Sequence, residues 1–433
     1  MSKLRFYTSR IVILSMVSTL AQLGHTLSLK EAMQAAQIHA TALEKSRYEK
    51  MATDEQKPLA RAALLPQIGV SGAYQVQNQI QPRHLQRNSQ SFRLSATQTI
   101  FNLSQWYKFK NSELVVQIAG QQLDLTEQQL LLKVSEAYFN VLVAKESLLS
   151  SQKAQASFAL QQKQAQVQFE KGVVSIVDVQ EAQAGYESAF ADELEIQAQL
   201  QQALAQLETY VGRTIELNEV KNTAINIVLF PNESLSVWQS KAASQNLEIQ
   251  MQAQLIHKAE QELKIAKANY YPTAELSSGY TYNPSDTGIY QAEDTRTGYV
   301  GVSVNLPLFT GGQTKAQVRQ AQANIQIAQS DLRLTQEKVR LSLIENYSKV
   351  QTGQQRIHAL ETLVHTNETK VASSNLGQKY GLMSNIDRIR AEKELYEARL
   401  KLTQAKYQYL QAQINLLQIT GEFNHNIFDL FTI

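Results

Sequence analysis

Two very long stretches of this chain contain no proline and almost no glycine. No proline occurs between residues 83 and 230, and from about 102 to 171 the only glycine is Gly120. Because proline and glycine are the residues that most often end helices, such stretches predict helices of unusual length. About 70 residues at 1.5 Å each make a helix of roughly 100 Å, or two helices end to end. A compact domain of 150 residues is only about 40 Å across, so these helices predict an elongated molecule.

The same pattern returns in the second half of the chain. A second long helix is predicted over about 310–378, and a shorter return helix follows each long one, over about 176–212 and 385–421. The return helices carry apolar residues at steps of three and four, for example at Leu200 and Leu204, a spacing typical of coiled coils. We therefore expect two long helical hairpins.

Landmark residues of the first half recur in the second half at a nearly constant offset of 206 to 209 residues. A helical sequence rich in alanine and glutamine does not keep one offset through glycine, aspartate and proline by accident. The matched pairs are Pro66 with Pro272, Ile100-Phe101 with Leu308-Phe309, Gly172 with Gly381, Asp178 with Asp387, and Gly212 with Gly421. We predict a first repeat at 26–214, a linker at 215–232, a second repeat at 233–421 and a C-terminal tail at 422–433.

The N-terminus has the composition of a secretory signal peptide, predicted at 1–25. Lys3, Arg5 and Arg10 precede a short apolar run that begins at Ile11. An amphipathic first helix or a short anchor is the alternative, although the run is shorter than the roughly 20 apolar residues of a spanning helix. The cleavage site is poorly marked. No later stretch reaches 18 consecutive apolar residues, so no transmembrane helix is expected in the exported chain.

Each repeat also contains two segments of about 10–12 residues in which apolar and polar residues alternate. This period of two predicts strands with one wet face, and the length suffices for a tilted strand to cross a bilayer. A surface hairpin of a soluble sheet would show the same alternation. The apolar positions are Ile68, Val70, Tyr74, Val76, Phe92, Leu94 and Ile100 in the first repeat, and Leu276, Tyr280, Tyr282, Val300, Val302 and Val304 in the second. The loops between the paired strands are expected at 78–90 and 283–296.

Aromatic residues gather at one end of these strands, as in the interfacial girdle of a membrane barrel. They are Phe101, Trp106, Tyr107, Tyr270, Tyr271 and Phe309. In lipid every backbone donor and acceptor must be paired, so a membrane sheet has to close on itself. Four strands cannot close, since the smallest known barrels have eight. The chain is therefore expected to share a barrel with copies of itself, and a trimer supplies twelve strands.

The remaining composition argues against an enzyme and against nucleic-acid binding. The net charge is only +2, and the chain has no cysteine for a disulfide or a thiolate metal site. The stretch 311–315, Gly-Gly-Gln-Thr-Lys, lacks the spacing of a phosphate-binding loop. His358 and His365 lie two turns apart on a predicted helix, without a third ligand in view. We expect no catalytic residue, no cofactor and no metal site.

The order of these features resembles the TolC family of outer-membrane efflux ducts over about residues 28–421. The residues that carry the resemblance are Ala63-Leu64-Leu65-Pro66 before the first strand, Ser135-Glu136-Ala137-Tyr138-Phe139 in the long helix, the break at 171–180, and Leu306-Pro307-Leu308-Phe309-Thr310-Gly311-Gly312 after the fourth strand. The resemblance implies a mainly α fold with a small β part. Long helical hairpins would form a trimeric α-barrel tunnel, and four strands per chain would enter a shared 12-stranded transmembrane β-barrel. It also implies a periplasmic adaptor and a proton-driven or ATP-driven inner-membrane pump as partners.

The two helix breaks are expected at the periplasmic end of the tunnel. Their glycines and apolar neighbours would be exposed in an isolated trimer, and exposed apolar tips mark a contact, here with the adaptor. The residues are Gly172, Val173, Val174, Gly381, Leu382 and Met383. Plain helix capping is the alternative reading of any one of them.

The resemblance further implies a gate beside these tips. Asp178 and Asp387 match the acidic positions that form rings in familiar members of the family. This sequence departs from them by carrying Arg390 at a second acidic position and Met383 in place of the latch arginine. A latch from Arg388 or Arg390 to Asp178 or Glu181 on the adjacent hairpin is one interpretation. An ordinary i,i+3 pair of Asp387 with Arg390 is the other, worth only about 0.2–0.5 kcal/mol.

These expectations predict an outer-membrane exit duct that extends into the periplasm of a Gram-negative bacterium and passes small molecules such as drugs or toxic compounds. An outer-membrane channel for type I protein secretion is the alternative, because the same tunnel serves both and the pump selects the cargo. A periplasmic coiled-coil scaffold without a pore is a more remote alternative, since it would leave four amphipathic strands unused.

Overall fold

The structure is a computed structural model that describes residues 27–79, 85–220, 233–284, 293–380 and 382–423. The predicted signal peptide at 1–25, most of the linker and nearly all of the C-terminal tail lie outside these residues. The elements of the first half are α1 (Leu29–His39), α2 (Thr41–Asp54), α3 (Gln56–Ala62), β1 (Gln67–Gln79), β2 (Leu85–Phe101), α4 (Leu103–Glu170) and α5 (Ile176–Val211). Those of the second half are α6 (Leu235–Gln245), α7 (Leu247–Ala268), β3 (Thr273–Asn283), β4 (Thr295–Asn305), α8 (Gln313–Lys379) and α9 (Asn385–Ile419).

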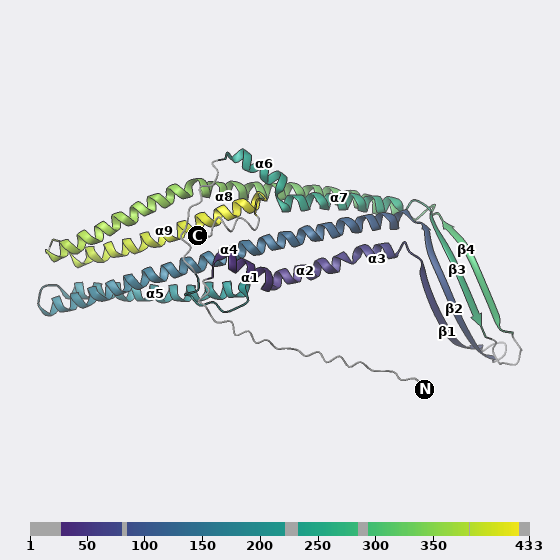
Figure 1. The fold of residues 1–433 in the computed structure, drawn as a ribbon, viewed down its shortest axis with the longest axis horizontal. Helices are drawn as coiled ribbons and strands as arrows, with labels where there is room; N and C mark the ends of the chain where they lie inside the picture. Colours follow the sequence, from purple (N-terminus) through teal and green to yellow (C-terminus); the bar gives the residue numbers. More distant parts are fainter. Residues whose placement is uncertain (1–26, 80–84, 221–232, 285–292, 381, 424–433) are drawn as a thin grey trace, which may run out of the picture.

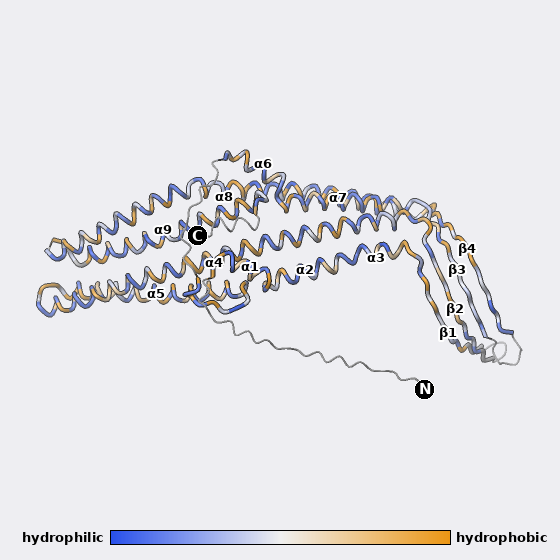
Figure 2. Tube along the Cα trace, in the orientation of Figure 1, coloured by the Kyte–Doolittle hydropathy of each residue, from blue (hydrophilic) through white to orange (hydrophobic). Residues whose placement is uncertain are grey.

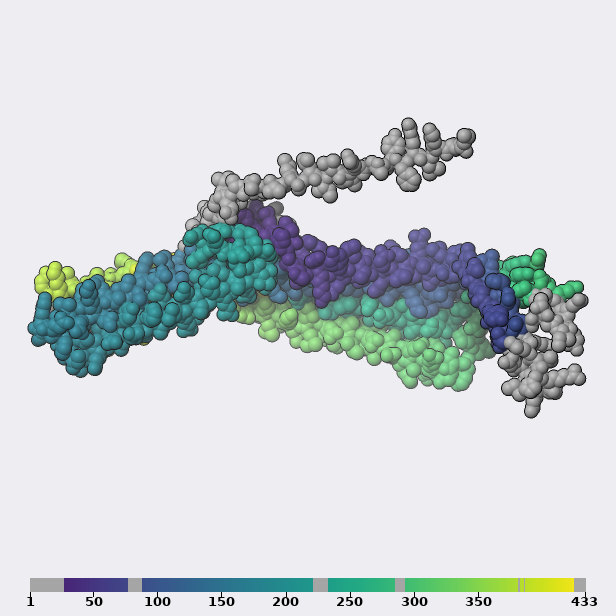
Figure 3. All heavy atoms as spheres, turned by 90° about the horizontal axis from the view of Figure 1, so that it is seen from below, coloured from purple at the N-terminus to yellow at the C-terminus, as the bar shows by residue number. Residues whose placement is uncertain are grey.

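The molecule is a long shaft of helices with a small sheet at one end and two hairpin tips at the other (Figure 1). The helices α4 and α8 contain 68 and 67 residues, and each is followed by a return helix, α5 or α9. Both long helical hairpins are therefore confirmed, with ends within about three residues of the predicted ones. Helices α1–α3 and the α6–α7 pair run along the half of the shaft nearer the sheet, and α1–α3 cover one side of it (Figure 3).

Polar and apolar residues are interspersed along every long helix, without an extended hydrophobic segment (Figure 2). Within the described ranges, no helix combines the length and the apolar character that crossing a membrane requires.

The four strands form one antiparallel sheet in the order β1-β2-β3-β4, so the β2–β3 pair joins the two halves of the chain. The loop expected at 78–90 is too long, because β1 continues to Gln79 and β2 already begins at Leu85. Backbone pairing from Gln77 with Arg87 to Tyr74 with Gln90 holds this polar stretch in the sheet although its side chains do not alternate. Between β3 and β4, residues 285–292 lie outside the description.

The largest core lies at mid-shaft, where α1 packs against α4 and α5. Fully buried Tyr138 donates a hydrogen bond from its hydroxyl to the carbonyl oxygen of Leu27 at 3.0 Å. The Lys145 ammonium donates to the carbonyl oxygens of Leu217 and Val220, at 3.2 and 2.8 Å. These contacts tie the start of the described chain and the first residues of the linker to the middle of α4. The core therefore fixes where the first hairpin leaves the shaft.

The second repeat is anchored at the same height by Asn246, which is buried between α6 and α7. Its side-chain oxygen accepts from the Ile249 amide at 3.1 Å and caps α7. Its amide nitrogen donates to the Ile419 carbonyl at 2.9 Å, at the end of α9. One side chain thus starts one helix and satisfies the end of another, which sets the base of the second hairpin.

Candidate functional site

The two hairpin tips have the same local construction. In the first tip α4 ends at Glu170, Gly172 has a φ of 70°, and the Val173 amide donates to the Gln168 carbonyl at 2.9 Å. In the second, Gly381 lies outside the described residues, and the Leu382 amide donates to the Gly377 carbonyl at 2.8 Å. Glycine suits the first tip because its backbone tolerates positive φ. Each tip is a tight helix-to-helix turn, as predicted.

A capping box starts the return helix after each tip. The Ser175 hydroxyl donates to Asp178 Oδ2 at 2.6 Å, and the Asp178 amide donates back to Ser175 Oγ at 3.3 Å. Ser384 and Asp387 repeat the pattern at 2.7 and 3.2 Å. The serine hydrogen bonds, side chain before backbone, lower the pKa of both carboxyl groups. Each aspartate expected at the gate therefore already has a structural role at a helix N-terminus.

The tips expose apolar side chains in the single chain. Leu382 is 81% exposed and Val173 is 68% exposed, whereas Val174 is half-buried. Met383 is 41% exposed, and its side chain packs against Gly377. Ile176, Val177 and Tyr380 add to the apolar surface, with exposures of 49%, 56% and 69%. The tips thus offer a compact apolar surface with no partner within the described chain.

Above the tips, a groove of about 1050 Å³ separates α5 from α9, with α4 also lining it. We call this space the hairpin groove. Small side chains form much of its lining: Ala144, Ser147, Ser151, Ala154, Ala184, Gly185, Ser188 and Ala189. Such residues keep the groove open where bulkier residues would fill it. A Cβ on Gly185 would already lie 3.5 Å from the Phe158 ring of α4 and 3.7 Å from Ile389 of α9.

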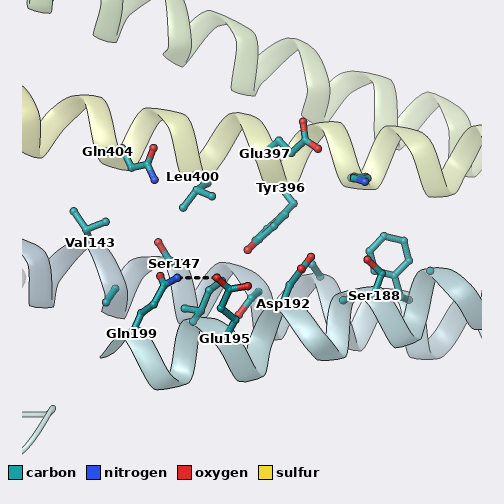
Figure 4. A pocket seen from close by; sticks show the side chains of 18 of the residues that line it. Val143, Ser147, Ser188, Asp192, Glu195, Gln199, Tyr396, Glu397, Leu400 and Gln404 are labelled. Carbon is teal, nitrogen blue, oxygen red and sulfur yellow. Dashed lines mark hydrogen bonds between the residues drawn. The ribbon is translucent and has the colours of Figure 1, made fainter. Parts of the chain in front are cut away.

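Charges of opposite sign lie on the two walls of the hairpin groove. Glu181, Asp192 and Glu195 belong to α5, and Arg390, Lys393 and Glu397 to α9. The Tyr396 ring projects from α9 toward Asp192 and Glu195 (Figure 4). Burial, followed by these two negative charges, raises the pKa of the Tyr396 hydroxyl. The α5 wall is therefore electronegative, and the α9 wall carries its two cations at 390–393, with Glu397 one turn beyond them.

Only some of the residues predicted to form the latch lie near one another in the structure. Glu181 and Arg390 line the same groove from opposite walls. Asp178 and Asp387 each bind their own serine, and no ion pair joins these aspartates to Arg388 or Arg390 among the described residues. Arg390 contributes to the lowered pKa of Asp387 only after the Ser384 hydrogen bonds. The inter-hairpin latch stays a prediction.

Arg388 contacts Gln164 rather than Asp178 or Glu181, the acids predicted as its latch partners. It is 8% exposed, and its Nη1 donates to Gln164 Oε1 of α4 at 3.1 Å. Its Nε and Nη2 find no hydrogen-bond partner among the described residues. Burial lowers the pKa of Arg388, and the charge of Glu392 one turn later opposes that shift. No local sequence signal predicts the role of Gln164, since this contact depends on the packing of α9 against α4.

The predicted aromatic girdle lies at the junction of the sheet with the long helices. Phe101 ends β2, Trp106 and Tyr107 lie in the first turns of α4, and the Tyr270-Tyr271 pair precedes β3. Phe309 lies between β4 and α8 and is 89% exposed. Trp106 packs against Phe109 with ring centroids 6.1 Å apart, and the Lys110 ammonium lies 5.7 Å from the Trp106 ring centroid. All six residues are thus at one level along the molecule, whereas their role at a membrane interface remains a prediction.

Comparison with known proteins gives one consistent result. The sequence model of the outer membrane efflux protein family matches residues 32–213 and again 238–422. Outer membrane protein TolC of Salmonella enteritidis is 28% identical over 423 residues, which cover 95% of this chain and 84% of that protein. The proteases secretion protein PrtF of Dickeya chrysanthemi is 25% identical over 427 residues, covering 95% of this chain and 91% of PrtF. The structure of the Campylobacter jejuni CmeC outer membrane channel superposes with a TM-score of 0.80 at 15% identity, over 93% of this chain and 89% of that one.

Proposed function

Because this chain belongs to the outer membrane efflux protein family, we propose that three copies of it form one continuous duct across the outer membrane and the periplasm. The protein is an outer-membrane exit duct for efflux or secretion. In the trimer, each chain would contribute its sheet to a 12-stranded β-barrel and its long helices to an α-helical tunnel. The girdle residues would then lie at the periplasmic surface of the membrane.

The edges of the sheet are the observation that carries the trimer. In the order β1-β2-β3-β4, one side of β1 and one side of β4 have no partner strand within the described chain. These strands are 13 and 11 residues long. In a bilayer each unsatisfied backbone group costs several kcal/mol, so both edges must be paired by another chain. Pairing β1 of one copy with β4 of the next closes the barrel.

The assembly is tested by extracting the protein in mild detergent and measuring its mass by light scattering. We expect a trimer whose circular dichroism retains the strand contribution. A homogeneous monomer with the same strand signal would contradict the shared barrel.

Family membership does not specify the cargo or the partners, so both are part of the proposal. We propose small-molecule efflux through an adaptor and a pump, with protein export as the second candidate because PrtF, named for protease secretion, matches nearly this whole chain. The relevant measurement is export from cells that lack the gene, supplied with either a drug or a secreted protease. Restored drug tolerance supports efflux, and restored protease secretion supports the second candidate.

The adaptor is proposed to dock on the apolar tips. Val173 and Leu382 are the most exposed apolar tip residues of the two hairpins, and aspartate at both positions places charge in a contact that must be dry. We expect Val173→Asp with Leu382→Asp to abolish export while trimers remain in the membrane. The matched control is aspartate at Leu160, which is 58% exposed on α4 away from the tip. Normal export by the double variant would rule out this docking site.

A further inference from the structure

One face of the sheet is polar and carries Arg93; by the strand register Arg87 lies on the same face, six residues farther from the helices. The strand registers define three complete rows across this face. From the helix end outward they are Gln67-Thr97-Ser277-Gly301, Gly69-Ser95-Gly279-Tyr299 and Ser71-Arg93-Thr281-Thr297. Arg93 is the one charged residue of these twelve.

The opposite face of the sheet is apolar. Its character indicates which face contacts lipid and which faces the barrel interior. Val70 and Val300 are each 79% exposed in the single chain, and Ile68 is 74% exposed. In a membrane barrel the apolar positions contact lipid and the alternate positions face the interior. The rows that contain Arg93 therefore line the lumen of the proposed barrel.

The surroundings of Arg93 leave its guanidinium free to reach into that lumen. Its cross-strand neighbours, Ser71 and Thr281, are short, and the Arg93 side chain is exposed. The ion pairs found in the described part of the chain do not include Arg93. In the adjacent row the Tyr299 ring lies across Gly279, where a Cβ would be only 2.6 Å from Tyr299 Cε1. The neighbouring space thus holds a phenol rather than a carboxylate.

Arg93 lies far from the helices, at the middle of β2. It precedes the end of β2 at Phe101 by eight residues, about 26 Å of strand. Its neighbour Phe92, on the lipid face, stacks on Tyr282 with ring centroids 6.5 Å apart. The long helices leave the sheet at the Phe101 end of β2 (Figure 1). Arg93 is therefore at a level where the apolar face carries the aromatic residues Phe92 and Tyr282.

We propose that the Arg93 side chains of three copies form a cationic ring inside the barrel, well away from its helix end, which favours the passage of anionic cargo carrying phosphate or carboxylate groups. The proposal rests on the trimeric barrel of the proposed function. Rings of like charge inside a pore with low-dielectric walls concentrate the opposite ion. Glu275, the acid on the same face, is six strand residues from Thr281, or about 20 Å from the level of the ring. At physiological salt the Debye length is about 8 Å, so Glu275 does not cancel the ring.

The absence of cysteine from the whole chain permits a direct measurement of the local potential. Ser95→Cys places one thiol on the lumen face, two residues from Arg93 toward the helices. Trimers reconstituted in vesicles are treated with membrane-impermeant methanethiosulfonates of negative or positive charge, and the two modification rates are compared. We expect Arg93→Gln to lower the anionic-to-cationic rate ratio at least about threefold. The difference should shrink in 1 M salt, where the Debye length is about 3 Å.

Arg296→Gln is the matched control. Arg296 lies in the row next to Arg93 but on the apolar face, with its guanidinium 5.4 Å from the Tyr282 ring centroid. Its removal changes net charge equally and should leave the ratio unchanged. A ratio that does not change in Arg93→Gln, or that changes equally in Arg296→Gln, would overturn the ring while leaving the barrel intact. A Ser95→Cys trimer that neither reagent modifies would instead overturn the barrel lumen together with the ring.

Discussion

Positions 212 and 421 each require glycine for two reasons. Their φ values are 78° and 72°, in the left-handed region that other residues rarely adopt. A Cβ on Gly212 would lie 2.6 Å from the His39 Cβ, and one on Gly421 would lie 2.5 Å from the Gln245 carbonyl oxygen. His39 and Gln245 are the last residues of α1 and α6. Each glycine therefore allows the end of a return helix to pack directly on a break between two short helices.

We expect Gly212→Ala and Gly421→Ala each to destabilise the protein. Strain in the left-handed region alone costs about 1–2 kcal/mol, and the overlap adds to it. Gly120→Ala is the control, since this glycine lies inside α4 with nothing within 4 Å of the added Cβ. Alanine there should raise helix stability by about 0.5–1 kcal/mol. Thermal unfolding of the detergent-extracted protein distinguishes the three, and equal effects would show that the mid-shaft glycines are not constrained.

The Arg388–Gln164 contact gives a second prediction for single residues. Replacing a buried charged group by an apolar residue of similar size is often neutral or stabilising, whereas removing its partner leaves the charge uncompensated. Gln164→Leu should therefore loosen the start of α9 more than Arg388→Met does. Amide exchange at the first turns of α9 is the measurement. A greater loss of protection in Arg388→Met would mean that the guanidinium itself, rather than its need for an acceptor, holds the hairpins together.

The elements show which structural features the sequence could predict. The C-terminal end of α4 was predictable because Gly172 is a local signal for ending a helix. The start of α5 was predictable because the Ser175–Asp178 capping box is a local signal for starting one. The start of β2 at Leu85 was not, since its first residues are polar on both faces and backbone pairing with β1 holds them. Gln164 and Tyr396 were also missed, because their contacts depend on the packing of α9 against the first hairpin.

The two hairpins are also stabilised in different ways. In α8–α9, three ion pairs cross between the helices: Lys370–Glu394 at 2.6 Å, Arg399–Glu368 at 2.8 Å and Lys406–Glu361 at 2.9 Å. Between α4 and α5, no ion pair is found among the described residues, and buried Leu200, Leu204 and Leu207 contribute to the core instead. Exposed ion pairs contribute only about 0–1 kcal/mol each and weaken in salt. Salt should therefore weaken the contacts between α8 and α9 more than those between α4 and α5.

Acid should loosen the starts of α5 and α9 because of their capping boxes. The folded-state pKa values of Asp178 and Asp387 lie below the ordinary value of 3.8. Folding therefore favours the ionised carboxylates, and these carboxylates in turn stabilise the folded protein. This contribution to stability is complete above pH 3.8 and is lost as the pH falls through the folded-state pKa values of the two aspartates. Limited proteolysis at the tips should accelerate over that acidic range. Asp178→Asn with Asp387→Asn should remove most of the pH dependence, and an unaltered acid response in this variant would refute the assignment.

At the scale of the whole molecule, the chain has surfaces that suit the proposed assembly. Its sheet has two edges to pair, its tips expose apolar residues, and its hairpin groove stays open between α5 and α9. The groove lies where the two repeats meet, and small side chains there permit the walls to approach. A change in the angle between the hairpins would therefore change the width of the proposed tunnel at its periplasmic end.

The opposed charges of the hairpin groove make that angle adjustable. Glu181 and Arg390 lie on opposite walls, so their attraction favours the narrower arrangement without locking it. Removing a few kcal/mol of preference is enough to shift a two-state population toward its open form. We therefore expect Glu181→Ala with Arg390→Ala to raise single-channel conductance in planar bilayers, and each single variant to raise it less.

Asp178 is left intact because its loss would also uncap α5. Lys163→Gln, on the exposed surface of α4 outside the groove, should behave like the parent. Conductance of the double variant equal to that of the parent would leave Glu181 and Arg390 as ordinary helix-surface charges.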